Sequence, residues 1–266
     1  MGAPIGRRPS ARVPTSVALV VVSLLAAACS PDQASIDAAA LQGSSPVTFR
    51  ASDGVKLEGR VFGPNDSTAG VVLAHGLSLD QSSWFTFADR LGDAGYLVLT
   101  FDFRGYCPGD ERGCSGGAKD VGSTPGDLSA AVEEIRSQGA RRVAILGSSM
   151  GGTATLVASA SLGDRIEALV TLSAPTQIED LAAEPDVLQA ITAAKLFMAG
   201  TGDGTAAQAA EVFFEQSLQP KRYEILTTDD HGVAMLEGNQ GEASRNLILD
   251  WLAQYLPVDE PTPANN

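Results

Sequence analysis

Histidine is scarce in this chain of 266 residues, which contains only His75 and His231. A serine or cysteine nucleophile most often relies on histidine as its base, so only two residues compete for that role. Basic clusters are also missing after residue 12, apart from two Lys/Arg pairs, and the formal net charge is −14. Because nucleic-acid-binding proteins carry basic patches, we expect no nucleic-acid partner.

The marks of cofactor and metal sites are missing as well. No G-x-G-x-x-G motif follows the first apolar strand, and cysteine and histidine do not gather at the spacings of metal ligands. We therefore expect neither a cofactor nor a metal ion. The sequence has no internal repeat and no second domain boundary, and its length suits one domain with a large core.

Long apolar runs are limited to one near the N-terminus. Three arginines precede residues 17–28, which are apolar except for Ser23. These twelve residues suit the hydrophobic region of a signal peptide and are fewer than the roughly 20 that a membrane-spanning helix needs. The small residues before Cys29 resemble a bacterial lipoprotein signal, although Leu25 stands four positions before the cysteine instead of the usual three.

We accordingly expect residues 1–28 to be a signal peptide, and Cys29 to be lipidated on the extracytoplasmic side of the cell membrane. The alternatives are a secretory signal cleaved after Ala-x-Ala and an uncleaved anchor. Residues 29–46 are small and polar without a strong period, which predicts a tether. Residues 257–266 contain three prolines and predict a disordered tail. This leaves residues 47–256 as the folded domain.

Apolar segments of strand length alternate with segments of helical periodicity in this domain. Strands are expected at residues 47–51, 56–62, 70–74, 96–101, 142–146, 166–172, 195–199 and 222–226. Helices are expected at residues 82–94, from a cap at Thr124, directly after residue 149, at residues 206–218 and up to residue 255. This alternation predicts an α/β fold, a mostly parallel sheet of about eight strands with helices on both faces. Ligands of such folds bind beyond the carboxyl ends of the strands.

Residues 147–151 fit the pattern G-x-S-x-G, with Ser149 at the centre. They lie between an apolar strand and a helix of small residues, which is the context of a nucleophile elbow. The strained turn points the serine hydroxyl out of the sheet. Side chains at Gly147 and Gly151 are expected to collide with the helix that follows. The N–H of Met150 is expected to face a developing oxyanion.

The acid that orients the base must lie between Ser149 and His231, in a loop after a strand. Asp203 meets this condition, because it follows an apolar strand and stands among glycines. Its expected role is to hold the imidazole tautomer and stabilise the charged form of the ring. The rivals are Asp229 and Asp230, which neighbour His231 in sequence and are therefore poorly placed to orient its ring.

Five segments in this order resemble the α/β-hydrolase superfamily, close to its dienelactone-hydrolase-like and serine-aminopeptidase-like branches. They are His75-Gly76, Asp102-Phe103-Arg104-Gly105, Gly147-Ser148-Ser149-Met150-Gly151-Gly152, Gly202-Asp203-Gly204 and Asp230-His231-Gly232. The order nucleophile, acid, histidine makes His231 the base.

The resemblance also implies roles for the earlier motifs. His75 is expected to shape an oxyanion loop rather than act as the base, and the N–H of Leu77 is the expected second oxyanion donor. Asp102 and Arg104 are expected to fix a loop rather than do chemistry. Dienelactone hydrolases use cysteine as nucleophile, so a serine argues against that reaction.

The chain departs from the family's D-x-R-G-x-G-x-S pattern at Cys107, which stands at a glycine position before a short insertion ending at Cys114. With Cys29 assigned to the lipid, these two cysteines remain as a pair. Export favours a disulfide between them. Such a bridge contributes about 2–3 kcal/mol in the chain-entropy model and stiffens the rim of the site.

The substrate is the least determined feature. Only residues 174–194 occupy the place where lipases and many peptidases of this fold carry a large lid, so we expect an open site. Apolar residues that are either acyl wall or ordinary core are Leu77, Trp84, Phe85 and Met150. We expect a serine hydrolase that cleaves small neutral carboxylic esters through an acyl-enzyme. Peptidase, thioesterase and acyltransferase activities remain open, as does a non-catalytic envelope lipoprotein, and the sequence does not indicate an oligomeric state.

Overall fold

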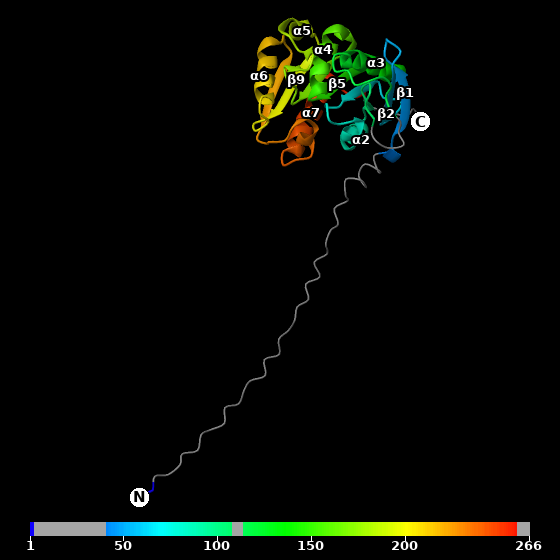
Figure 1. The fold of residues 1–266 in the computed structure, drawn as a ribbon. Helices are drawn as coiled ribbons and strands as arrows, with labels where there is room; N and C mark the ends of the chain where they lie inside the picture. Colours follow the sequence, from blue (N-terminus) through cyan, green and yellow to red (C-terminus); the bar gives the residue numbers. More distant parts are fainter. Residues whose placement is uncertain (3–40, 108–113, 260–266) are drawn as a thin grey trace. The chain divides into compact units, whose positions relative to one another are not determined.

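An eight-stranded sheet forms the centre of the domain (Figure 1). The computed structural model describes residues 1–2, 41–107 and 114–259. The strand order is β1-β2-β4-β3-β5-β6-β9-β10. The pairs β1–β2 and β2–β4 are antiparallel and the others are parallel. The strands are β1 Ser45–Arg50, β2 Lys56–Phe62, β3 Ala69–Ala74, β4 Leu97–Phe101, β5 Arg142–Ser148, β6 Ala168–Leu172, β9 Ala194–Gly200 and β10 Lys221–Leu226. The predicted fold class is confirmed.

Burial on both faces explains why the central strands show no polar alternation. Every residue of β3, β4, β6 and β9 is buried. Strands covered by helices on both sides form continuous apolar runs, because neither face meets water. In the edge strand β1, by contrast, only Phe49 is buried.

Helices cover both faces of the sheet. They are α2 Phe85–Asp93, α3 Thr124–Ser137, α4 Met150–Leu162, α5 Pro185–Ala190, α6 Ala206–Gln216 and α7 Gly241–Tyr255. One core cluster joins the sheet to α3, α4, α5 and α6, and a second joins it to α2 and α7. Figure 1 shows α2 and α7 on the side opposite α3 and α4. Burial of these apolar faces is the main driving force for folding.

The helix expected from Thr124 begins there, but Thr124 is not its cap. The N-cap residue is Ser123, and the Thr124 hydroxyl donates to the carbonyl of Val121 at 2.7 Å. Asp127, in the first turn, accepts hydrogen bonds from Arg104. The predicted cap is therefore wrong by one residue, because threonine hydroxyls also bond to nearby turn carbonyls.

The segment between β6 and β9 contains two short strands as well as the short helix α5. The strands β7 (Gln177–Ile178) and β8 (Leu181–Ala182) form an antiparallel hairpin before α5. The hairpin packs on the loop before α3, since a Cβ at Gly122 would lie 2.5 Å from the Asp180 carboxylate. Strands of two residues are too short to show a period of two, so the sequence pattern did not reveal them.

Contacts of the domain reach past both of its predicted ends. Leu41 and Val258 pack against the second core cluster. The Arg142 guanidinium donates to the carbonyl of Pro257 at 2.6 Å and pairs with Asp259 at 3.2 Å. The ordered domain thus includes residues that the sequence had assigned to the tether and the tail.

Most of the predicted signal peptide, Cys29, most of the tether and residues 260–266 lie outside the described residues. Within the part of the chain that is described, no helix is both long and apolar enough to cross a membrane.

Candidate active site

The turn at Ser149 joins β5 to α4. Ser149 has φ 51° and ψ −117°, a left-handed conformation that costs a non-glycine residue about 1–3 kcal/mol. Its N–H donates to the carbonyl of Leu172 at 2.8 Å, and its carbonyl accepts from Gly152 and Thr153. The β5–β6 ladder on one side and the first turn of α4 on the other therefore hold the strained residue in place.

Close packing explains the glycines around this turn. A Cβ at Gly147 would lie 2.2 Å from the carbonyl oxygen of Gly151, so the predicted collision with the following helix is confirmed. A Cβ at Gly151 would instead meet the carbonyl oxygens of Ala74 at 2.4 Å and His75 at 2.6 Å. The prediction for Gly151 named the wrong neighbour, because α4 starts directly over the end of β3.

His231 and Asp203 meet beyond the carboxyl ends of β10 and β9. The two groups are 2.7 Å apart, His231 Nδ1 to Asp203 Oδ1. The His231 side chain is half exposed, whereas that of Asp203 is 11% exposed. The second carboxylate oxygen, Oδ2, is buried and has no hydrogen-bond partner among the described residues. The carboxylate is thus directed at a single imidazole.

The rival carboxylates have other places in the loop. Asp229 lies over Gly202, where a Cβ would come within 1.7 Å of its Oδ1. Asp230 accepts a hydrogen bond from Thr228 Oγ1 at 2.6 Å. Of the three aspartates that the sequence allowed, the structure brings Asp203 to the histidine.

Two shallow cavities flank Ser149 and His231. One, of about 310 Å³, is also lined by Asp203, Asp229 and Thr205. The other, of about 260 Å³, is lined by Leu77, Leu79 and Ile178. The site therefore has one polar and one apolar side.

No hydrogen bond joins Ser149 to His231 in the described structure. Catalytic contacts of this kind often tighten only when substrate binds.

Two serines that the sequence analysis did not single out hold the loop after His231. Ser173 Oγ accepts from the N–H of Gly232 at 2.9 Å, and Ser148 Oγ accepts from the N–H of Val233 at 3.2 Å. Ser148 ends β5 and Ser173 follows β6. Their position at strand ends was the sequence signal that could have indicated a role in the site. The bonds themselves were not predictable, because the partner of Ser173 lies 59 residues away and that of Ser148 lies 85 residues away.

Leu77 lines the same cavity as Ser149, and Met150 follows Ser149 in the chain. Met150 is the first residue of α4, where backbone N–H groups have no intrahelical acceptor. A Cβ at Gly76, which precedes Leu77, would lie 3.4 Å from Ser149 Cβ. In the described residues neither N–H has an acceptor. The two N–H groups are therefore available as donors, and their role toward an oxyanion stays a prediction.

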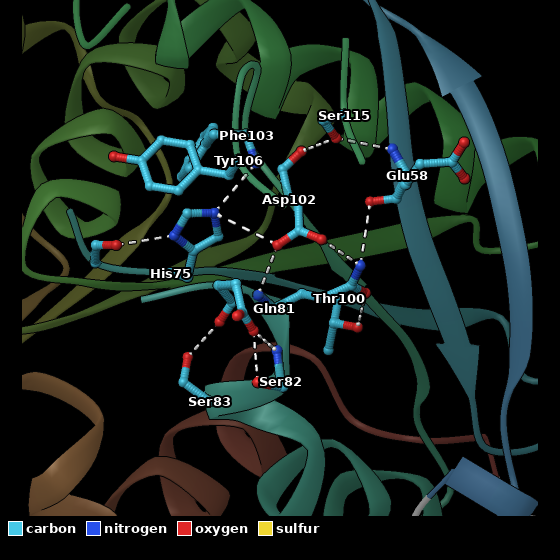
Figure 2. A network of polar contacts seen from close by, with 12 residues as sticks. Glu58, His75, Gln81, Ser82, Ser83, Thr100, Asp102, Phe103, Tyr106 and Ser115 are labelled. Carbon is cyan, nitrogen blue, oxygen red and sulfur yellow. Dashed lines mark hydrogen bonds and ion pairs between the residues drawn. The ribbon is translucent and has the colours of Figure 1, made fainter. Parts of the chain in front are cut away.

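His75 is part of a buried network behind the oxyanion loop (Figure 2). Its Nδ1–H donates to the carbonyl of Gly76 at 2.8 Å, and its Nε2 accepts from the N–H of Phe103 at 3.1 Å. Burial lowers the pKa of His75 to about 4, so the ring is neutral and its 3.9 Å approach to Asp102 is no ion pair. Asp102 accepts from the N–H and the side-chain amide of Gln81. His75 and Asp102 thus shape the loop.

Arg104 also fixes a loop. Its guanidinium bonds the buried Asp127 at 2.6 Å and the half-exposed Asp53 at 2.8 Å. The hydrogen bond with Asp127 is the main cause that raises the pKa of Arg104. Cys107 and Cys114 form the predicted disulfide, with their Cα atoms 4.3 Å apart. Both features match what the sequence led us to expect.

Comparison with known proteins identifies the family. A model described as the alpha/beta hydrolase family matches residues 71–264, which is more than half of the chain. The chain belongs to this family.

Two curated relatives of this family member match over a limited length. A 2-hydroxy-6-oxononadienedioate/2-hydroxy-6-oxononatrienedioate hydrolase of Paraburkholderia phymatum is 30% identical over 42% of this chain and 39% of its own. A pimeloyl-[acyl-carrier protein] methyl ester esterase of Aliivibrio fischeri is 28% identical over 39% of this chain and 35% of its own. The match thus spans about two fifths or less of these relatives' length.

Solved structures match over most of the hydrolase domain. An esterase of Pyrococcus furiosus has a TM-score of 0.68 and 19% identity, covering 80% of this chain and 91% of that one. A dienelactone hydrolase of Anabaena variabilis has a TM-score of 0.66 and 25% identity, covering 80% and 98%. These likenesses support the fold.

His75 is expected to stay neutral in the folded hydrolase well below pH 6.5. Its pKa of about 4 is below its ordinary value of 6.5, so only the unfolded chain gains a proton between these values. Stability from this group is therefore complete above pH 6.5 and falls by up to about 3 kcal/mol as the pH drops to 4. Imidazole ¹⁵N NMR of the His231→Ala variant, which keeps one histidine, is expected to show an Nδ1–H tautomer at pH 5.5. A midpoint near 6.5 would contradict the buried network.

Ser173→Ala is expected to lower stability, whereas Ser159→Ala is not. Ser173→Ala leaves the buried N–H of Gly232 without an acceptor, which costs about 1–3 kcal/mol. Ser159, in α4, has a buried hydroxyl with no partner among the described residues, so Ser159→Ala is expected to be neutral or slightly stabilising. Urea unfolding measures both. Equal losses in the two variants would contradict a specific role for Ser173.

Proposed function

We propose that this protein is a serine hydrolase that cleaves carboxylic esters, with Ser149 as nucleophile, His231 as base and Asp203 as the orienting acid. The observation that carries the proposal is the 2.7 Å contact between His231 Nδ1 and Asp203 Oδ1, in a cavity that Ser149 also lines. A strained serine beside a carboxylate-paired histidine is the arrangement of a nucleophile with its base.

The reaction begins when Ser149 Oγ attacks the ester carbonyl carbon and gives its proton to His231. The Asp203 carboxylate stabilises the imidazolium. The N–H groups of Leu77 and Met150 donate to the oxyanion of the tetrahedral intermediate. Collapse expels the alcohol, which takes the proton from His231 and leaves an acyl-enzyme. Water then attacks the acyl group with His231 again as base, releasing the carboxylic acid and restoring Ser149.

The two cavities favour a neutral ester with a small apolar part. Leu77, Leu79 and Ile178 offer an apolar wall beside the oxyanion donors. Asp203 and Asp229 line the opposite side, and their negative charge disfavours an anionic group there. Esterases among the relatives and among the structural neighbours support ester substrates. Peptidase, thioesterase and acyltransferase activities are the alternatives, and they require the same triad.

Export and anchoring belong to the same proposal. The sequence of residues 17–29 supports a lipoprotein signal with lipid on Cys29, and plain secretion is the alternative. The exposed Cys107–Cys114 disulfide supports an oxidising compartment, because such bonds persist outside the cytosol.

Labelling with a fluorophosphonate serine probe tests the function. The folded wild type is expected to be labelled, with the modified peptide mapping to Ser149 rather than to its neighbour Ser148. Ser149→Ala is expected to lose labelling completely, and His231→Ala to lose labelling rate by at least about 100-fold, because the base is gone. Hydrolysis of p-nitrophenyl acetate and butyrate is expected to follow the same order.

A folded wild type that is neither labelled nor active on these esters would overturn the proposal and favour a non-catalytic lipoprotein. Ser129→Ala, on α3 and remote from both cavities, is the matched serine control and is expected to label like the wild type.

A further inference from the structure

The Tyr106 hydroxyl contacts both residues that offer oxyanion donors. It donates to the carbonyl of Leu77 at 2.9 Å and lies 3.7 Å from the sulfur of Met150. The Tyr106 side chain is buried, with 3% of the residue exposed. The catalytic mechanism above assigns this hydroxyl no role, yet it reaches the two sides of the oxyanion site at once.

The bond to Leu77 matters because of peptide geometry. The Leu77 N–H shares a rigid peptide plane with the carbonyl of Gly76, and the Leu77 carbonyl belongs to the next plane. His75 Nδ1–H and the N–H of Leu79 fix the first plane through the Gly76 oxygen, at 2.8 and 3.1 Å. Tyr106 fixes the second plane. With both planes held, the direction of the Leu77 N–H is set.

Tyr106 is itself held by its surroundings. Its ring stacks edge-on against the His75 ring with centroids 4.7 Å apart, as Figure 2 shows. The ammonium of Lys119 lies 3.8 Å from the centroid of the tyrosine ring, in reach of a cation–π interaction. These contacts orient the tyrosine ring. The hydrogen bond from its hydroxyl to the Leu77 carbonyl links the ring to the loop after β3.

The disulfide lies next to this tyrosine. The N–H of Gly105 donates to the carbonyl of Gly116 at 2.9 Å, and the N–H of Ser115 donates to the carbonyl of Tyr106 at 3.1 Å. The Cys107–Cys114 bond is the next rung of the same pair of segments. The covalent bond therefore ties the two segments together at the residue next to Tyr106.

We propose that Tyr106 is a positioning residue for the oxyanion site, and that the Cys107–Cys114 disulfide keeps it in position. This inference rests on the proposed serine-hydrolase function. Tyr106 touches no reacting atom; it acts through the backbone of Leu77 and the side chain of Met150. The transition state, which carries the oxyanion charge, then depends on Tyr106 more than the bound substrate does.

The hydroxyl remains a donor over the working pH range. Burial raises the pKa of Tyr106 above its ordinary value, and the negative charge of Glu179 in the β7–β8 turn raises it further. Loss of the hydroxyl is therefore expected to lower the rate without changing the shape of the pH profile.

Tyr106→Phe is the direct test, because it removes the hydroxyl and keeps the ring. We expect kcat on p-nitrophenyl butyrate to fall about tenfold with KM changed less than twofold, as for the loss of one hydrogen bond that acts in the transition state. Affinity for an alkylboronic acid, which forms a tetrahedral adduct, is expected to fall in the same proportion. Tyr96→Phe, at a tyrosine that is also 3% exposed but outside the site, is the matched control and is expected to keep wild-type kinetics.

The Cys107→Ser/Cys114→Ser variant tests the second part and serves as an independent probe should Tyr106→Phe not fold. It is expected to lower kcat and boronate affinity while keeping KM. Combined with Tyr106→Phe, it is expected to add little further loss, since each change releases the same contact.

Three results overturn the inference. They are an unchanged kcat in both variants, a loss expressed in KM alone, and fully additive losses in the combined variant. Wild-type activity and probe labelling separate these failures from a failure of the proposed function. If the wild type labels and hydrolyses esters and both variants keep its kcat, only the role of Tyr106 fails. If the wild type does neither, both proposals fail together.

Discussion

Ser149 holds a left-handed backbone that costs an ordinary residue about 1–3 kcal/mol, and the surrounding structure is arranged to keep it there. The strain persists because backbone packs directly on backbone at two glycines: Gly147 of β5 meets the start of α4, and Gly151 of α4 meets the end of β3. A helix that begins immediately after the serine also supplies the N–H of Met150. One turn thus sets the direction of the proposed nucleophile and the place of a proposed oxyanion donor.

The parallel strands bring the other residues of the site to the same end of the sheet, where the carboxyl ends of the strands lie. Asp203 follows β9 and His231 follows β10, while Ser148 at the end of β5 and Ser173 after β6 bond the backbone just beyond the histidine. The site is therefore built from loops whose ends are fixed by strands of one sheet. The opposite wall depends on the loop after β3, which the neutral His75 and the Tyr106 hydroxyl hold through two successive carbonyls.

Local patterns predicted the sheet, its helices, the serine turn and the disulfide, because each leaves a mark in neighbouring residues. The Asp203–His231 contact was predicted from strand order, since carboxyl ends of parallel strands share an edge. The neighbours of Gly151 were missed because they depend on how α4 lies over the distant strand β3. The cap of α3 was missed because the Thr124 hydroxyl bonds to a turn carbonyl instead. Tyr106 escaped for the same reason, since its acceptor Leu77 is 29 residues away. The β7–β8 hairpin was too short to carry a period.

A crystal structure of the mature domain after reaction with a fluorophosphonate measures the central claim most directly. Our account predicts phosphorus bonded to Ser149 Oγ, and a phosphonyl oxygen about 2.7–3.1 Å from the backbone nitrogens of Leu77 and Met150. It also predicts that the Tyr106 hydroxyl still bonds the Leu77 carbonyl in the adduct. An adduct on another residue, or a phosphonyl oxygen that faces solvent instead of these two N–H groups, would contradict the account.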